Sequence, residues 1–142
     1  MQDFTRLKVW RSAHELVLVV YRESDRFPAS ERMGLTPQMR RAAASIAANI
    51  AEGCGRDGPR ELARFLRIAM ASACELEYHL LLAADLEMLP RPTHTELAQR
   101  VSGLKRMLTA LIRCVRATPS RRSASVGSSS QPPETPVTTT GN

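Results

Sequence analysis

A repeating pattern of apolar side chains, extended over two long segments, restricts the fold of this chain more than any other sequence feature. Between residues 62 and 83, and again between 97 and 115, apolar residues recur at alternating steps of four and three. This spacing places them on one face of an α-helix, which turns once in about 3.6 residues. Residues 8–27 and 39–53 carry similar stripes. The sequence therefore predicts an all-α protein with four amphipathic helices.

Local signals set the expected helix ends. Pro28 stops the first helix, Thr36-Pro37 starts the second, and a capping box formed by Thr93 and Glu96 starts the fourth. The predicted helices are 8–26, 36–55, 59–88 and 93–117. Short connections make consecutive helices antiparallel neighbours, so we expect an up-down-up-down four-helix bundle over residues 1–117.

The remaining residues, 118–142, are mostly Ser, Thr, Pro and Gly. They contain too little apolar surface to offset the entropy lost on ordering, so we expect a disordered tail. The longest strictly apolar run, Leu16–Tyr21, is much shorter than the ~20 residues that a membrane helix needs. No signal peptide is evident, and three scattered cysteines do not suggest disulfides. We therefore expect a cytoplasmic protein with no membrane contact.

The chain is basic and its cations are almost all arginines. It has 20 Lys and Arg residues against 14 Asp and Glu, and only Lys8 and Lys105 are lysines. Basic stripes are expected on the outer faces of the third and fourth helices, at Arg56, Arg60, Arg64, Arg67, Lys105, Arg106, Arg113 and Arg116. One guanidinium group can bind two oxygens of a phosphate at once, so these stripes could follow a nucleic-acid backbone. The alternative is a solvated surface in an arginine-rich proteome.

Enzymatic motifs are weak in this sequence. Residues 53–58 spell G-x-G-x-x-G, but a dinucleotide site needs a preceding strand, and here a helix precedes it. Glu75, Glu77 and His79 do not have the Glu-x-x-His spacing of a di-iron site. We therefore expect a non-catalytic protein without a metal, a cofactor or a small-molecule substrate.

Some apolar residues lie away from the predicted core stripes. They are His14, Leu18 and Tyr21 on the first helix, and Tyr78 and Leu82 on the third. Scattered surface hydrophobes are common and could explain them. The other explanation is a contact between copies of this chain, in a homo-oligomer.

Residues 38–53 form the most distinctive segment. They carry the pattern Gln-x-x-Arg-Ala-x-x-Ser-Ile-x-x-Asn-Ile-Ala-Glu-Gly, whose polar members include Arg41, Ser45, Asn49 and Glu52, followed by Gly53. Arg41 and Glu52 are three helical turns apart and cannot pair, so each needs a partner on another helix, subunit or ligand. Asn49 lies between apolar neighbours and needs a hydrogen-bond partner.

This pattern resembles that of the 23S rRNA intervening-sequence protein family. Leu7–Trp10, Phe27-Pro28 and Phe65–Ala69 extend the likeness, whereas Ala47 and Cys54 depart from the family's usual Pro and aromatic residue. The resemblance implies a four-helix bundle. It also implies a similarity to the accessory protein of diversity-generating retroelements, a basic pentamer that binds nucleic acid and a reverse transcriptase.

Two functions remain open from the sequence. The first is an oligomeric protein, with five subunits as the resemblance implies, that binds RNA or another nucleic acid through its arginine stripes. The alternative is a protein-interaction scaffold or accessory subunit in which the arginines only confer solubility.

Overall fold

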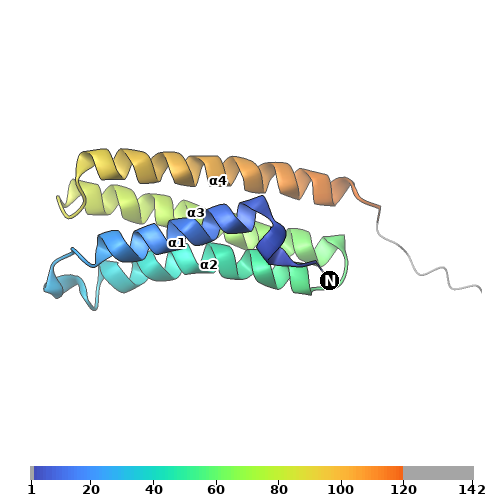
Figure 1. Ribbon diagram of the computed structural model, residues 1–142, viewed down its shortest axis with the longest axis horizontal. Helices are drawn as coiled ribbons and strands as arrows, with labels where there is room; N and C mark the ends of the chain where they lie inside the picture. Colours follow the sequence, from blue (N-terminus) through green and yellow to red (C-terminus); the bar gives the residue numbers. More distant parts are fainter. Residues whose placement is uncertain (1, 120–142) are drawn as a thin grey trace, which may run out of the picture.

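Four long helices make up residues 2–119, the part of the chain described in this computed structural model. They are α1 (Lys8–Ser24), α2 (Leu35–Gly55), α3 (Pro59–Asp85) and α4 (Arg91–Ala117). Two single-turn 3-10 helices, η1 (Phe4–Arg6) and η2 (Ala29–Glu31), precede α1 and α2. Each long helix runs antiparallel to the next (Figure 1). The predicted four-helix bundle is confirmed, whereas the predicted tail lies outside the described residues except for Thr118 and Pro119.

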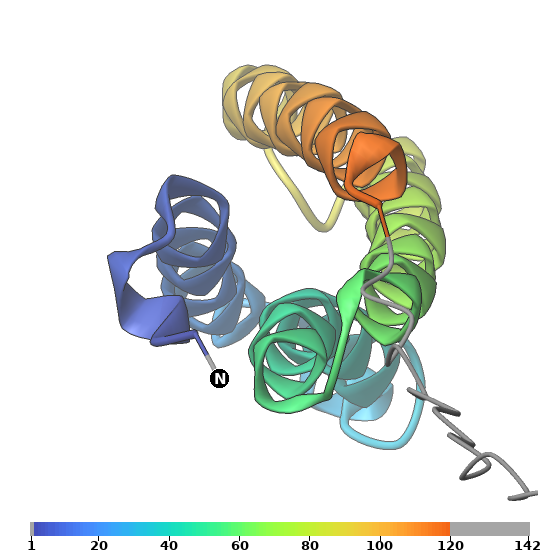
Figure 2. The same ribbon diagram turned by 90° about the vertical axis from the view of Figure 1, so that its right-hand side faces the viewer.

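The helices pack in chain order around the bundle axis (Figure 2). α2 contacts α1 and α3, α3 contacts α4, and α4 returns to α1 in the loosest of these contacts. α1 and α3 therefore lie diagonally across the bundle. Their outer faces point in different directions.

The core contains the apolar stripes that the sequence predicts. From residue 66 to 83 every member of the third stripe is buried, and in α4 only Leu111 is half-buried. The connection from α1 to α2 adds Phe27 and Leu35 to the same core. Although this core is apolar, no described helix is long and apolar enough to cross a membrane.

The α2–α3 contact depends on small and polar residues at fixed positions. A Cβ on Gly53 would lie 3.0 Å from Phe65 Cβ and 3.0 Å from Leu62 Cδ1, so the two helix backbones approach closely there. Two turns earlier, the Ser45 and Ser72 hydroxyls share a 2.8 Å hydrogen bond across the helices. The Asn49 amide donates to Ser45 Oγ at 3.0 Å and to Ser45 O at 2.8 Å. The expectation that Asn49 needs a partner is confirmed.

Four predicted helix ends were wrong. α1 ends at Ser24 rather than at Arg26. α2 is capped by the Glu31 carboxylate, which accepts the Leu35 N–H at 3.0 Å, and Thr36 lies inside the helix. α4 begins at Arg91, because Pro92 fits the first turn, and no capping box forms at Thr93. α3 ends at Asp85, where Glu87 takes a left-handed conformation (φ 61°) and the Met88 N–H donates to Ala83 O at 2.9 Å.

We predict that Gly53→Ala and Gly55→Ala change stability in opposite directions. At Gly53 the added methyl group meets Phe65 Cβ, which cannot move away because it is attached to the α3 backbone. We therefore expect the free energy of unfolding to fall by about 1–3 kcal/mol. At Gly55 nothing lies within 4 Å, and the better helix propensity of Ala should stabilise the protein by up to about 1 kcal/mol. Urea denaturation at one fixed protein concentration measures both. Equal effects would contradict the close α2–α3 approach.

Candidate nucleic-acid interface

Antiparallel packing brings the basic start of α3 beside the basic end of α4. On α3, Arg60, Arg64 and Arg67 all precede Ile68, and no Lys or Arg follows up to Asp85. On α4, the residues after Glu96 include no acid, while Arg113 and Arg116 lie near its end. The charge is therefore concentrated at the end of the bundle that holds the α2–α3 turn.

Three of the predicted interface residues form ion pairs within the chain. The Arg56 guanidinium lies 2.8 Å from Glu52 Oε1, Arg64 Nε lies 3.3 Å from Glu61 Oε2, and Lys105 Nζ lies 3.4 Å from Glu77. The hydrogen bond to Glu52 raises the pKa of Arg56 above its ordinary value. Arg106 makes only a neutral contact, donating to Ser102 Oγ at 3.1 Å.

Arg56 and Arg64 have a second structural contact at the same place. Their guanidinium carbons lie 5.2 Å and 4.6 Å from the ring centroid of Phe65, which is buried against the α2–α3 seam. A cation over an aromatic face is attracted by the ring quadrupole. Arg56 and Arg64 therefore cover Phe65 and stabilise the fold, a role that their spacing alone did not indicate.

The other arginines of the predicted interface remain available for a partner. Within residues 2–119, Arg60, Arg67, Arg113 and Arg116 are exposed and form no ion pair. We call these four residues the unpaired arginines. They come from both α3 and α4, and all lie at the basic end of the bundle.

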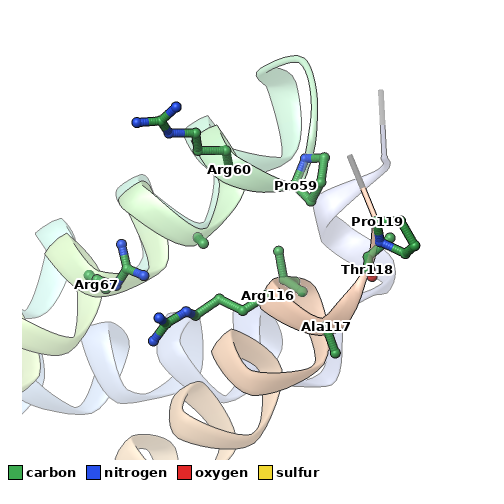
Figure 3. A pocket seen from close by; sticks show the side chains of 9 residues that line it. Pro59, Arg60, Arg67, Arg116, Ala117, Thr118 and Pro119 are labelled. Atoms are coloured by element: carbon green, nitrogen blue, oxygen red, sulfur yellow. The ribbon is translucent and has the colours of Figure 1, made fainter. Parts of the chain in front are cut away.

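Three of the unpaired arginines line one open cavity of about 660 Å³ between α3 and α4. In Figure 3, Arg67 extends from α3 and Arg116 from α4 toward the same opening, whereas Arg60 extends from the outer side of α3. The rest of the lining is Pro59, Ala63, Val115, Ala117, Thr118 and Pro119. No carboxylate, imidazole or thiol lines this cavity in the described part of the chain.

A second, shallower groove of about 400 Å³ follows the outer face of α4. It is lined by Ser102, Lys105, Arg106, Thr109, Ala110 and Arg113. Arg113 lies one turn before Arg116, so the groove and the cavity adjoin along α4. Both are lined by cations of α4, and these cations lie along one stretch of the helix from Lys105 to Arg116.

Helix stability does not explain why Arg60 lies where it does. Arg60 is in the first turn of α3, where the helix dipole already places partial positive charge and only Glu61 is acidic. Arg116 lies in the last turn of α4, where a cation is favourable. Arg60 therefore opposes the local field unless an anion is present.

The motif residues divide into two groups. Ser45, Asn49 and Gly53 face α3 and form the seam described above. Arg41 and Glu52 are exposed on the outer side of α2. The expectation that Glu52 needs a partner from another helix was wrong, since Arg56 follows one turn later in the chain and pairs with it.

The predicted oligomer residues are exposed, with one exception. Tyr78 is 60% exposed, Tyr21 45% and Leu18 43%, and His14 is exposed while stacking on the Trp10 ring at 5.0 Å. Leu82 instead packs partly against the core, so its assignment to the outer face was wrong. In and next to α3, the exposed apolar residues that the sequence did not indicate are Ile68 and Leu81 on the helix and Leu86 directly after it.

Potential metal and redox ligands are dispersed. No group of three or more His, Cys, Asp or Glu side chains lies at metal-binding distance among residues 2–119. His79 is buried, and its Nε2 lies 3.9 Å from Glu75 Oε1. Cys54 is buried, which raises the pKa of its thiol, whereas Cys74 and Cys114 are exposed.

Comparison with known proteins agrees with this architecture. The family model for the 23S rRNA-intervening sequence protein matches residues 5–110, which covers all of α1, α2 and α3 and most of α4. The chain belongs to this family. The match includes the α2–α3 seam and the start of α3, although it stops before Arg113 and Arg116.

Solved structures share the fold, and one of them can be compared in detail. It is a crystal structure of a protein of unknown function from the S23 ribosomal protein family of Bacteroides thetaiotaomicron. The two chains are 22% identical, with a TM-score of 0.67 over 74% of this chain and 98% of the other. Among curated proteins, none matches this chain in sequence.

We predict that Arg64 and Arg60 differ in their effect on stability. Arg64→Ala removes a cation over Phe65 and an exposed ion pair, so we expect a loss of about 1 kcal/mol in the free energy of unfolding. Arg60→Ala removes neither kind of contact and should change stability by less than about 0.5 kcal/mol. Thermal unfolding followed by circular dichroism measures both. If Arg60→Ala is the more damaging change, the division into structural and unpaired arginines is wrong.

Proposed function

We propose that this protein binds RNA or another nucleic acid through the basic end of its bundle. The observation that carries the proposal is the cavity between α3 and α4, which Arg60, Arg67 and Arg116 line and toward which Arg67 and Arg116 extend, with no carboxylate among its described lining residues. Arginines that serve only solubility are expected to be spread over the surface or paired with acidic residues, because like charges repel one another. Here three cations line one cavity instead, and one of them, Arg60, opposes the helix dipole.

The composition of the surface favours contacts with the nucleic-acid backbone over base reading. Guanidinium groups bind phosphate oxygens and release counterions, and this binding does not depend on sequence. Exposed aromatic rings for base stacking do not line the cavity or the α4 groove. The proposal includes no catalytic step, because the described lining of the cavity consists of arginines, apolar side chains and the Thr118 hydroxyl, without a carboxylate, imidazole or thiol.

We expect the affinity for RNA to fall steeply with salt in the wild-type protein. A fluorescence anisotropy titration from 50 to 300 mM KCl gives the slope of log K against log salt. In the triple variant Arg60→Gln, Arg67→Gln and Arg116→Gln, the slope should decrease by about one unit for each lost phosphate contact.

The matched control removes the same charge at the opposite end of the bundle. The control is the triple variant Arg22→Gln, Arg26→Gln and Arg32→Gln. These residues lie at the end of α1 and in the α1–α2 connection. This control should leave the slope nearly unchanged. Absence of binding at 50 mM KCl, or equal losses in both triple variants, would count against the proposed interface. A flat salt response would favour the scaffold function instead.

We also propose that the protein forms a homo-oligomer through α1 and α3. Leu18 and Tyr21 are exposed on α1, and Tyr78 and Leu81 are exposed on the diagonal helix α3. Burying the apolar surface that they still expose would stabilise a contact by about 25 cal/mol for each Å² removed from water. Two different apolar faces on different sides of one subunit suit a head-to-tail contact, which closes into a ring when the rotation between neighbouring subunits divides a full turn. The pentamer implied by the family resemblance would be such a ring.

We expect Leu18→Glu and Tyr78→Glu each to lower the mass in solution toward the single-chain value of 15.7 kDa. Light scattering coupled to size-exclusion chromatography measures this mass. Met33→Glu is the control, because Met33 is 94% exposed in the α1–α2 connection and lies on neither face. A wild-type protein with the mass of one chain would refute the oligomer.

Thiol labelling gives an independent readout of the same contact. Cys74 lies one turn before Tyr78 on the outer side of α3, whereas Cys114 lies near the end of α4. In the assembled protein a maleimide should therefore react with Cys114 faster than with Cys74. In Tyr78→Glu the two rates should become similar.

A further inference from the structure

We propose that the cavity between α3 and α4 holds the terminal phosphate of an RNA strand, a phosphate monoester. This inference rests on the proposed function and identifies which part of the nucleic acid the basic end recognises. It separates the cavity from the adjoining α4 groove, which would contact internal phosphates.

The first argument is the charge that faces the cavity. Arg67 and Arg116 extend toward one opening from two different helices, and neither forms an ion pair within the described residues (Figure 3). A terminal phosphate carries about −1.5 to −2 charges at pH 7 and has three free oxygens. An internal phosphodiester carries a single negative charge. Two facing guanidinium groups therefore match the charge of a monoester better than that of a diester.

The second argument is the contrast with the groove on α4. There Lys105 is paired with Glu77 at 3.4 Å, and Arg106 donates to Ser102 at 3.1 Å. Those two cations are partly satisfied, so among the described residues Arg113 is the one cation of the groove without a partner. The cavity has no such competing partner among the residues that line it.

The third argument is the position of the cavity on the basic surface. It lies at the end of α4, and the groove containing Arg113 and Arg106 leads away from it along the helix. From Arg116 to Arg106 the helix rises about 15 Å. A strand whose terminal phosphate occupies the cavity can therefore place its following phosphates along α4, with Arg60 at the cavity rim.

The test compares RNA oligonucleotides of one sequence with different ends. Three 12-nucleotide strands carry a 5′-phosphate only, a 3′-phosphate only, or hydroxyl groups at both ends, with the fluorophore attached to an internal base. We expect the wild-type protein at pH 7.5 to bind one phosphorylated strand about tenfold more tightly than the hydroxyl strand, a difference of ~1.4 kcal/mol. The strand that gains affinity identifies the end that is recognised.

Variants locate this preference in the cavity. Arg67→Gln with Arg116→Gln should bind all three strands with equal affinity, whereas Arg22→Gln with Arg26→Gln should keep the preference. All four positions are exposed, and circular dichroism checks that each variant keeps its helices. Lowering the pH below about 6, the second pKa of a phosphate monoester, should reduce the preference in the wild type.

The outcomes separate this inference from the proposed function. If the wild type binds all three strands equally and with a steep salt dependence, the terminal-phosphate inference is wrong and the proposed function stands. If the wild type binds none of them at low salt, both are wrong. If the preference persists in Arg67→Gln with Arg116→Gln, the phosphate binds elsewhere and the assignment to this cavity fails.

Discussion

The close approach of α2 and α3 is the contact on which the rest of this bundle depends. Gly53 lets the two backbones come together where a larger residue would meet Phe65 Cβ, and the Ser45–Ser72 hydrogen bond links the helices two turns away. An apolar seam alone would let the helices slide by one turn at small cost. A glycine at one point and a paired hydroxyl at another allow only one register, because a buried polar group without its partner is unfavourable.

The register of α2 and α3 also determines where the charges gather. α3 starts immediately after the α2–α3 turn, so its arginines lie at that end of the bundle, and α4 must return to the same end because it packs antiparallel to α3. Some of these arginines then serve the fold itself. Arg56 and Arg64 cover the Phe65 ring that closes the seam, which leaves Arg60, Arg67, Arg113 and Arg116 for a partner. Along the basic stripe of α3, arginines that stabilise the fold thus alternate with arginines that are available for the proposed binding.

The four-helix architecture of this chain agrees with its membership of the 23S rRNA-intervening sequence protein family. The family match covers the seam residues and Arg60, Arg64 and Arg67, but it ends before the last two turns of α4. The S23 family structure from Bacteroides thetaiotaomicron shares the fold at 22% identity. The proposed phosphate site therefore combines arginines inside the matched region with one, Arg116, beyond it.

The amino-acid sequence by itself determined the four helices, their apolar faces and the family, because helical periodicity and a 16-residue motif are local patterns. The helix ends were harder to predict from the sequence. Glu87 closes α3 in a left-handed conformation without the glycine that usually signals such an end, and Glu31 caps α2 from outside the helix. Only the tertiary structure decided that Lys105 pairs with Glu77, that Leu82 packs against the core, and that Arg67 and Arg116 share one cavity. These facts depend on contacts between residues far apart in the chain, and spacing along a single helix carries no information about what a neighbouring helix places opposite.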